Sequence, residues 1–205
     1  MPILLQRCIG FLSSVVLLPL LAAMSVAIRV ESPGPALFRA SRIGSGGTRF
    51  ECLKLRTMRN ATNDGPAVTV AGDRRVTRLG SLLRRSRLDE LPQLWNVARG
   101  EMLLVGPRPE DPRFVDLTDP LHHEVFTAMP GMTGAAQLAY LDEAEMLDSD
   151  DPEGRYIQTI LPQKLEIDAA YLRRRSFGLD VWIIAQTILA ALGRPPSREA
   201  IKARL

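Results

Sequence analysis

One long apolar segment constrains the fold of this chain more than any other feature. No charged residue occurs between Cys8 and Ile28, and roughly 20 apolar residues suffice to cross a bilayer core of about 30 Å as a helix. Pro19 lies near the middle, where it removes a backbone donor and clashes with the carbonyl of Val15. Serines about one turn earlier, Ser13 and Ser14, can satisfy carbonyls freed at a kink. The residues leave two forms open, a spanning helix and a bent, re-entrant segment.

The flanks of the apolar segment do not orient it. Arg7 precedes it and Arg29 follows it, so the positive-inside rule gives no clear direction. A cleaved signal peptide fits poorly, because a single arginine makes a weak n-region and the apolar run is long for an h-region. We therefore expect a membrane segment that is retained in the mature protein.

Length and charge narrow the class of partner. A chain of 205 residues suits one domain plus an appendage. The net charge of +3 is unevenly spread, with arginines crowded into residues 29–113 and acids into residues 139–153. A basic half beside a membrane segment favours anionic headgroups or phosphorylated substrates. Nucleic acid is disfavoured as a partner, because no aromatic residues for stacking are interleaved with the arginines.

The cysteines and histidines indicate no metal or disulfide chemistry. Cys8 and Cys52 do not form a disulfide framework, and the two histidines, His122 and His123, are adjacent. Zinc chemistry is therefore disfavoured. We expect the histidines to lie on an exposed helix face.

The remaining pattern predicts a mainly helical α+β domain. Ser32-Pro33-Gly34-Pro35 ends the first helix, and two short strands, 36–39 and 50–55, follow. The glycines of residues 44–47 between them lack the Lys-Ser/Thr of a P-loop and indicate a hairpin turn. We expect a mobile surface loop over 59–72. Helices are predicted over 78–87, 92–98, 113–129, 152–175 with a kink at Pro162, and 178–192, before a loosely ordered tail from Arg194. The last of these helices is so apolar that it must be buried or lie against lipid.

The densest chemistry lies between residues 84 and 110. Asp89 and Glu90 follow three arginines, and Arg108 stands between two prolines. Arginine is suited to bidentate contact with phosphate, so this pattern fits an acidic group that works on a polyanion. As an alternative, the two acids could simply complement the dipole of the next helix. We expect the nearby arginines to lower the pKa of Asp89 and keep it ionised.

These motifs closely resemble the bacterial sugar transferases, the small monotopic phosphoglycosyl transferases that load a phosphosugar onto undecaprenyl phosphate. Blocks similar to those of the family occur in order along nearly the whole chain. They are Ser32–Pro35 with Phe38-Arg39, Lys54–Met58, Asp73 with Arg75–Gly80, Asp89–Val97, Val105–Pro109, Pro130–Gly134, and the C-terminal Asp168, Tyr171, Ser176, Asp180 and Thr187. The chain departs from the family pattern at several positions, among them Gly10, where an Asp is usual.

The resemblance implies a fold and a location. It implies a re-entrant membrane helix over residues 1–30 that breaks at Pro19, a compact cytoplasmic catalytic domain over 31–193 with a small β-hairpin or sheet and interfacial amphipathic helices, and a tail over 194–205. The expected location is the cytoplasmic face of the bacterial inner membrane, with monotopic topology.

The resemblance also implies a reaction. A UDP-sugar would donate its phosphosugar to undecaprenyl (polyprenyl) phosphate and release UMP, as the first membrane step of cell-surface glycan biosynthesis. In a ping-pong route, Asp89 is the expected nucleophile and Glu90 its catalytic partner, as base or metal ligand. Asp89 and Glu90 would hold Mg²⁺ together with phosphate oxygens. The expected phosphate-binding residues are Lys54, Arg84 and Arg108.

A second function class stays open at this stage. A non-enzymatic, membrane-anchored basic module that binds anionic lipid or acts as an assembly adaptor would explain the arginines and the apolar segment. It would not explain why Asp89-Glu90 accompanies Gly-Pro-Arg-Pro. A homo-oligomer is compatible with either function class.

Overall fold

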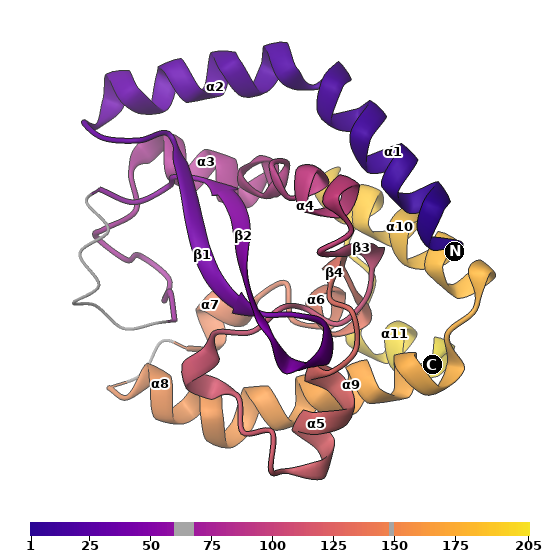
Figure 1. Ribbon diagram of the computed structural model, residues 1–205. Helices are drawn as coiled ribbons and strands as arrows, with labels where there is room; N and C mark the ends of the chain where they lie inside the picture. Colours follow the sequence, from indigo (N-terminus) through magenta and orange to yellow (C-terminus); the bar gives the residue numbers. More distant parts are fainter. Residues whose placement is uncertain (60–67, 148–149) are drawn as a thin grey trace.

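The N-terminal segment forms two helices joined at a sharp bend (Figure 1). The structure, a computed structural model, describes residues 1–59, 68–147 and 150–205. Helices α1 (Ile3–Val16) and α2 (Leu18–Glu31) meet at Leu17 at an angle of 58°. Pro19 lies in the first turn of α2, where a missing backbone N–H removes no helical hydrogen bond. The predicted break at Pro19 is therefore confirmed as the start of a new helix.

The hydroxyl of Ser14 has a different role from the predicted one. It donates to the carbonyl of Gly10 at 2.7 Å, one turn earlier in α1, and not to the carbonyl of Val15 that the proline frees. Within the described ranges, no single helix has the length and apolarity needed to cross a membrane. The bent pair α1 and α2 meets those criteria only when its two helices are taken together.

Helix α1 packs closely on α4 (Gln93–Arg99) because Gly10 has no side chain. A Cβ atom at Gly10 would lie 2.8 Å from the carbonyl oxygen of Leu94 and 3.0 Å from the amide nitrogen of Ala98. Nearby, the buried Gln6 accepts a hydrogen bond from the backbone N–H of Leu104 at 2.8 Å. Gly10 and Gln6 thus attach the N-terminal helix pair to the rest of the chain.

Gly10→Ala should weaken this attachment. The added methyl group would meet backbone atoms that cannot move aside, and overpacking of this kind costs about 1–3 kcal/mol. Gly178→Ala is the matched control, because a Cβ there meets nothing within 4 Å and alanine is the better helix former. Thermal unfolding in detergent should show a lower midpoint for Gly10→Ala only. An unchanged midpoint would contradict the close contact.

The chain turns after α2 through residues 32–34, which we call the elbow, and Arg56 binds their carbonyls. Arg56 is 6% exposed as a residue, and its guanidinium donates to the carbonyls of Pro33 and Ser32, both at 2.7 Å. Glu31, the last residue of α2, accepts from the backbone N–H of Leu79 at 3.1 Å. The elbow therefore fixes the end of α2 against the start of α3 (Arg78–Arg85).

Two antiparallel strands follow the elbow. Strand β1 (Leu37–Ile43) pairs with β2 (Arg49–Leu55), so the first strand is longer than predicted and the second nearly matches. A tight turn, η1 (Ser45–Gly47), joins them, with Gly46 and Gly47 at φ of 68° and 72°. The predicted hairpin is confirmed. Its glycines occupy a left-handed region that few other residues tolerate.

A second sheet consists of two very short parallel strands, β3 (Leu103–Val105) and β4 (Gly131–Thr133). No strand was predicted at either place. Between them, the helix predicted over 113–129 is only partly present, as the turn η3 (Pro112–Phe114) and helix α5 (Pro120–Phe126). Within α5, His123 is exposed as expected, whereas His122 is half-buried against Phe126.

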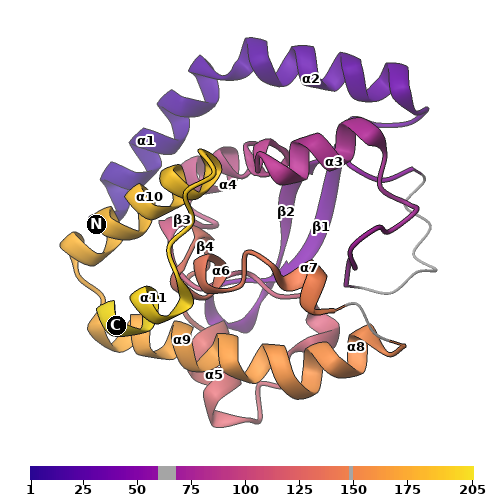
Figure 2. The same ribbon diagram turned by 180° about the vertical axis from the view of Figure 1, so that it is seen from behind.

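The C-terminal half is mostly helical (Figure 2) and supplies most residues of the main hydrophobic core. Helix α6 (Ala135–Ala139) and α7 (Glu143–Met146) precede a continuous rod of α8 (Pro152–Arg155), one π-helical turn η4 (Tyr156–Ile160) and α9 (Leu161–Arg174). The π turn immediately before Pro162 is the irregularity expected at that proline. Helix α10 (Phe177–Ala191) buries Leu179, Asp180 and Ile183 but exposes apolar residues on its other side.

The prediction of a loosely ordered tail from Arg194 is wrong. Residues 198–204 form helix α11, which Ser197 caps by accepting from the N–H of Ala200. Ile201 is fully buried in the main core and Leu205 is nearly so. These two residues are one turn apart and share a helix face, so burial in the core orders the tail. Of the loop predicted over 59–72, residues 60–67 lie outside the described residues.

Candidate active site

The two predicted catalytic carboxylates lie on a tight turn after α3. Helix α3 ends at Arg85, and the chain reverses through Arg87 into the turn η2 (Leu88–Glu90). Arg87 has a φ of 56° and is the one non-glycine residue with a left-handed backbone among those described. Such conformations cost of order 1–3 kcal/mol and cluster at functional sites. Asp89 and Glu90 are both buried at this turn.

Glu90 is held by donors from three different segments. Its Oε1 accepts from Lys54 Nζ at 3.2 Å and from Arg108 Nη2 at 2.9 Å, and its Oε2 accepts from Gln137 Nε2 at 3.1 Å. Lys54 comes from β2, Arg108 follows β3, and Gln137 lies on α6. We call these four residues the Glu90 cluster. Three of its members, Lys54, Glu90 and Arg108, were predicted to be site residues.

Charge pairing sets the ionisation of this cluster. Burial alone would raise the pKa of Glu90, but the charges of Arg108 and Lys54 hold that pKa well below its usual range. The Glu90 carboxylate in turn raises the pKa of Arg108. Burial lowers the pKa of Lys54, while the Glu90 charge opposes that change. These charges favour the ionised form of Glu90, and both of its carboxylate oxygens accept hydrogen bonds.

Asp89 differs from its neighbour. Among the residues described, no hydrogen bond or ion pair to its carboxylate is found. Burial, and then the adjacent charge of Glu90, raise the pKa of Asp89, although Lys54, Arg84 and Arg108 act in the opposite sense. The expectation that arginines would lower this pKa is therefore wrong, because removal from water outweighs their attraction. Asp89 is a buried, uncommitted carboxylate with increased basicity.

Arg84 lies on the Asp89 side of the site and outside the Glu90 cluster. Its Nε donates to the hydroxyl of Thr57 at 2.8 Å, and its charge acts on Asp89. Burial lowers the pKa of Arg84 and also that of Arg87. Four cations therefore act on the two carboxylates Asp89 and Glu90: Lys54, Arg84, Arg87 and Arg108. The excess positive charge suits an anionic ligand.

Close backbone contacts between two glycine-containing segments position Arg108 and Gln137. A Cβ at Gly131 would lie 2.0 Å from the amide nitrogen of Gly106, and one at Gly134 would lie 2.3 Å from the carbonyl oxygen of Gly106. The N–H of Gly131 donates to the carbonyl of Pro107 at 2.8 Å. Only glycine permits this approach. It brings the segment that carries Arg108 against the start of α6.

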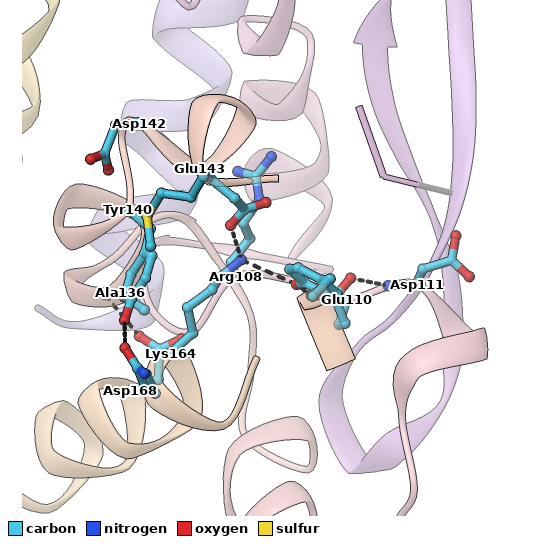
Figure 3. A network of polar contacts seen from close by, with 12 residues as sticks. Arg108, Glu110, Asp111, Ala136, Tyr140, Asp142, Glu143, Lys164 and Asp168 are labelled. Atoms are coloured by element: carbon cyan, nitrogen blue, oxygen red, sulfur yellow. Dashed lines mark hydrogen bonds and ion pairs between the residues drawn. The ribbon is translucent and has the colours of Figure 1, made fainter. Parts of the chain in front are cut away.

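A polar network that includes Arg108 extends to α7 and α9 (Figure 3). Lys164 Nζ donates to Glu143 at 2.6 Å and to the hydroxyl of Tyr156 at 3.1 Å, and that hydroxyl donates to Glu110. Asp168 accepts from the N–H of Ala136 at 3.2 Å. These contacts connect α9 to α6, to α7 and to the residues that follow Arg108. They support the segments that carry Arg108 and Gln137.

Asp168 should make stability depend on pH. Burial raises its pKa from 3.8 to about 7, although the Ala136 N–H and the Lys164 charge lower it. The folded state then holds a proton that the unfolded state loses above about pH 4. The free energy of unfolding should therefore fall by about 4 kcal/mol between about pH 4 and 7, and it should level off above pH 7.

The measurement is urea unfolding of the wild type and Asp168→Asn at several pH values in detergent. The neutral amide removes the titration, so the stability of the variant relative to wild type should rise from pH 4 to 7. A difference that does not change with pH would show that Asp168 ionises normally in the folded protein.

Comparison with known proteins identifies the family. Residues 3–194 match the model of the bacterial sugar transferase family. The chain belongs to that family. Membership thus covers the N-terminal helix pair and the whole site, whereas α11 lies beyond the matched residues.

Curated relatives of this sugar transferase are named as phosphotransferases that act on undecaprenyl phosphate. It is 42% identical over 179 residues to a UDP-glucose:undecaprenyl-phosphate glucose-1-phosphate transferase of Caulobacter vibrioides, covering 85% of this chain and 63% of the relative. It is 37% identical over 196 residues to a UDP-N-acetylgalactosamine-undecaprenyl-phosphate N-acetylgalactosaminephosphotransferase of Aeromonas hydrophila, covering 92% and 44%. The chain therefore spans about half the length of these two relatives.

A further relative is comparable in length. The exopolysaccharide production protein PSS of Rhizobium leguminosarum bv. phaseoli is 34% identical over 206 residues, which cover 95% of this chain and 98% of the relative.

Two residues that shape the candidate site were missed at the sequence level. Gln137 is a buried donor to Glu90, and its only signal was one polar side chain in the apolar run Ala135–Ala139. Asn96 is fully buried on α4, where its amide accepts from the N–H of Leu53 and donates to the carbonyl of Glu51. Asn96 thereby holds β2, and with it Lys54, against α4.

Proposed function

We propose that this protein transfers a phosphosugar from a UDP-sugar to undecaprenyl (polyprenyl) phosphate and releases UMP. The observation that carries the proposal is the contrast between two adjacent carboxylates. Glu90 is fully paired, whereas no described residue pairs with Asp89, and its pKa is raised. A buried carboxylate that is free to react and is surrounded by cations suits covalent phosphoryl chemistry. The names of the relatives support the same reaction class.

The proposed first step uses Asp89 as the nucleophile. A carboxylate oxygen attacks the phosphorus that bears the sugar, and the bond from that phosphorus to the bridging oxygen breaks. UMP leaves with the bonding electron pair, and the phosphosugar stays on Asp89 as an acyl phosphate. Arg108, Lys54 and Arg84 stabilise the charge on the phosphate oxygens. The raised pKa of Asp89 makes its ionised form a better nucleophile than an exposed aspartate.

The second step regenerates the carboxylate. An oxygen of the lipid phosphate attacks the same phosphorus, and the bond to the Asp89 oxygen breaks, which gives a polyprenyl-diphosphate-linked sugar. Glu90 is the proposed partner of this step as a fixed anion that orients Arg108 and Lys54 on the transferred group. A direct role of Glu90 as a base would require release of its present donors and a pKa far above the one it has here.

Mg²⁺ is the proposed cofactor. Among the described residues, no three His, Cys, Asp or Glu side chains are grouped as metal ligands. Two oxygen donors near the site remain uncommitted, the Asp89 carboxylate and the buried Gln137 Oε1. Mg²⁺ is commonly held by one or two carboxylates together with substrate phosphates and water, so Asp89 suits it better than the fully paired Glu90. Bound there, the ion would neutralise the diphosphate.

The proposed location is the cytoplasmic face of the bacterial inner membrane, with residues 1–30 as a re-entrant hairpin. Large apolar side chains are exposed along α1 and α2, on α10 at Phe177 and Ile188, and at Leu192 just after α10. The views in Figures 1 and 2 place α1 beside α10 at the same end of the molecule. A polyprenyl phosphate must be drawn from lipid, and such a surface would bring the site to it.

The hairpin topology can be tested by thiol labelling. Single cysteines at residue 2 and near residue 200, in a background lacking Cys8 and Cys52, are exposed to a membrane-impermeant reagent in intact cells. Both should stay protected until the cells are opened. Labelling of residue 2 alone would mean that the segment spans the membrane.

The proposed reaction is tested by UMP release from purified protein. The assay supplies undecaprenyl phosphate, Mg²⁺ and a panel of UDP-sugars that includes UDP-glucose and UDP-N-acetylgalactosamine, the donors named for the relatives. At least one donor should give UMP that depends on both lipid phosphate and Mg²⁺. Vesicle binding without turnover on any donor would instead favour the membrane-anchored basic module.

A further inference from the structure

The C-terminal helix α11 contacts the short segment that carries Gln137. Arg198, the first residue of α11, donates from Nε to the carbonyl of Ala139 at 2.9 Å and from Nη2 to Asp142 at 3.2 Å. Its guanidinium also lies 4.4 Å from the ring centroid of Tyr140. These contacts fall on the last residue of α6 and on the link between α6 and α7.

The link between α6 and α7 has little regular structure of its own. Helix α6 has only five residues, and Tyr140, which follows it, has an irregular backbone with φ of −122° and ψ of 45°. The carbonyls at a helix end lack intrahelical partners. Arg198 satisfies one of them and stacks on the next side chain. The buried residues Ile201 and Leu205 fix the helix that supplies Arg198.

Gln137, two residues before the end of α6, contacts the candidate site. Gln137 Nε2 donates to Glu90, and its Oε1 is a buried acceptor with no hydrogen-bond donor in the described structure. A shift of α6 would therefore move both the third donor of the Glu90 cluster and the buried Gln137 Oε1.

We propose that Arg198 is a positioning residue, which holds α6 so that Gln137 keeps its hydrogen bond with Glu90. It acts from a helix beyond the residues that match the family model. The effect on catalysis rests on the function proposed above. The structural effect on Gln137 does not.

A double-mutant cycle tests the catalytic part. Arg198→Ala should lower kcat/KM for UMP release by about two- to thirtyfold, the range expected for positioning through packed contacts. If Arg198 acts through Gln137, then Gln137→Ala with Arg198→Ala should lose no more than Gln137→Ala alone. Arg204→Ala is the matched control, since Arg204 lies on the same helix but contacts the ring of Trp182; it should leave kcat/KM within twofold of wild type. The proposal would be overturned if the double variant lost the product of the two single losses, or if Arg198→Ala had wild-type kinetics.

A second measurement does not depend on turnover. In ¹⁵N-labelled protein, the side-chain amide signal of Gln137 is assigned by its loss in Gln137→Ala. It should shift or broaden in Arg198→Ala, move less in Arg198→Lys, which keeps the charge and stem, and stay in place in Arg204→Ala. An unmoved signal in Arg198→Ala overturns the positioning role. A wild type that releases no UMP while the signal shifts would instead refute the proposed function and leave the positioning role supported.

Discussion

Asp89→Asn should lower the rate of UMP release by at least about a thousandfold, the scale seen when a covalent nucleophile is removed. Asparagine has nearly the same shape, but its amide oxygen is a far weaker nucleophile than a carboxylate. The loss should therefore be chemical and not structural. No described residue pairs with the Asp89 carboxylate, so the substitution breaks no hydrogen bond or ion pair there.

The controls for this variant separate chemistry from folding. Its thermal midpoint in detergent should be at least that of wild type, because a buried carboxylate with a raised pKa is replaced by a neutral group. Asp150→Asn changes an exposed carboxylate in the same way and should retain full activity. Substantial UMP release by Asp89→Asn would exclude Asp89 as the nucleophile.

Arg108→Lys should lower kcat/KM by roughly ten- to a hundredfold, which corresponds to about 1.5–3 kcal/mol for one charged hydrogen bond in a buried site. The guanidinium donates from Nη2 to Glu90 at 2.9 Å, and its other N–H groups, which bond to no described residue, are available to a phosphate. Lysine offers a single ammonium group and cannot bridge two acceptors with the same planar geometry. The binding of substrate and the chemical step should both suffer.

Arg99→Lys is the matched control for Arg108→Lys. Arg99 forms an exposed ion pair with Glu101 at the end of α4, where lysine should serve equally well. Wild-type kinetics in Arg108→Lys would show that Arg108 only supports the local structure.

Patterns within a few neighbouring residues predicted the bends and turns of the fold. Pro19 predicted the break between α1 and α2, and the glycines near residue 46 predicted the turn of the hairpin, because each residue imposes its own backbone restriction. The strands β3 and β4 have three residues each and are far apart in sequence, so neither periodicity nor a turn could reveal their pairing. The tail was misjudged because the pocket for Ile201 is made by distant elements.

The candidate site shows the same division. Asp89, Glu90 and Arg108 were recognisable from residue types and spacing, and the structure brings Glu90 and Arg108 into direct contact. Gln137 was missed because its partner lies 47 residues away. The direction of the Asp89 pKa was wrong because a count of neighbouring arginines does not include burial, which is a property of the folded chain.

The central claim is that the phosphosugar passes through a covalent bond to Asp89, and intact-protein mass spectrometry tests it most directly. Protein is incubated with Mg²⁺ and an accepted UDP-sugar in the absence of lipid phosphate, quenched and weighed. The wild type should gain the mass of one phosphosugar, peptide mapping should place it on Asp89, and added undecaprenyl phosphate should remove it. Asp89→Asn should gain nothing. UMP release that requires both substrates at once, with no adduct on the wild type at any time, would contradict the covalent route.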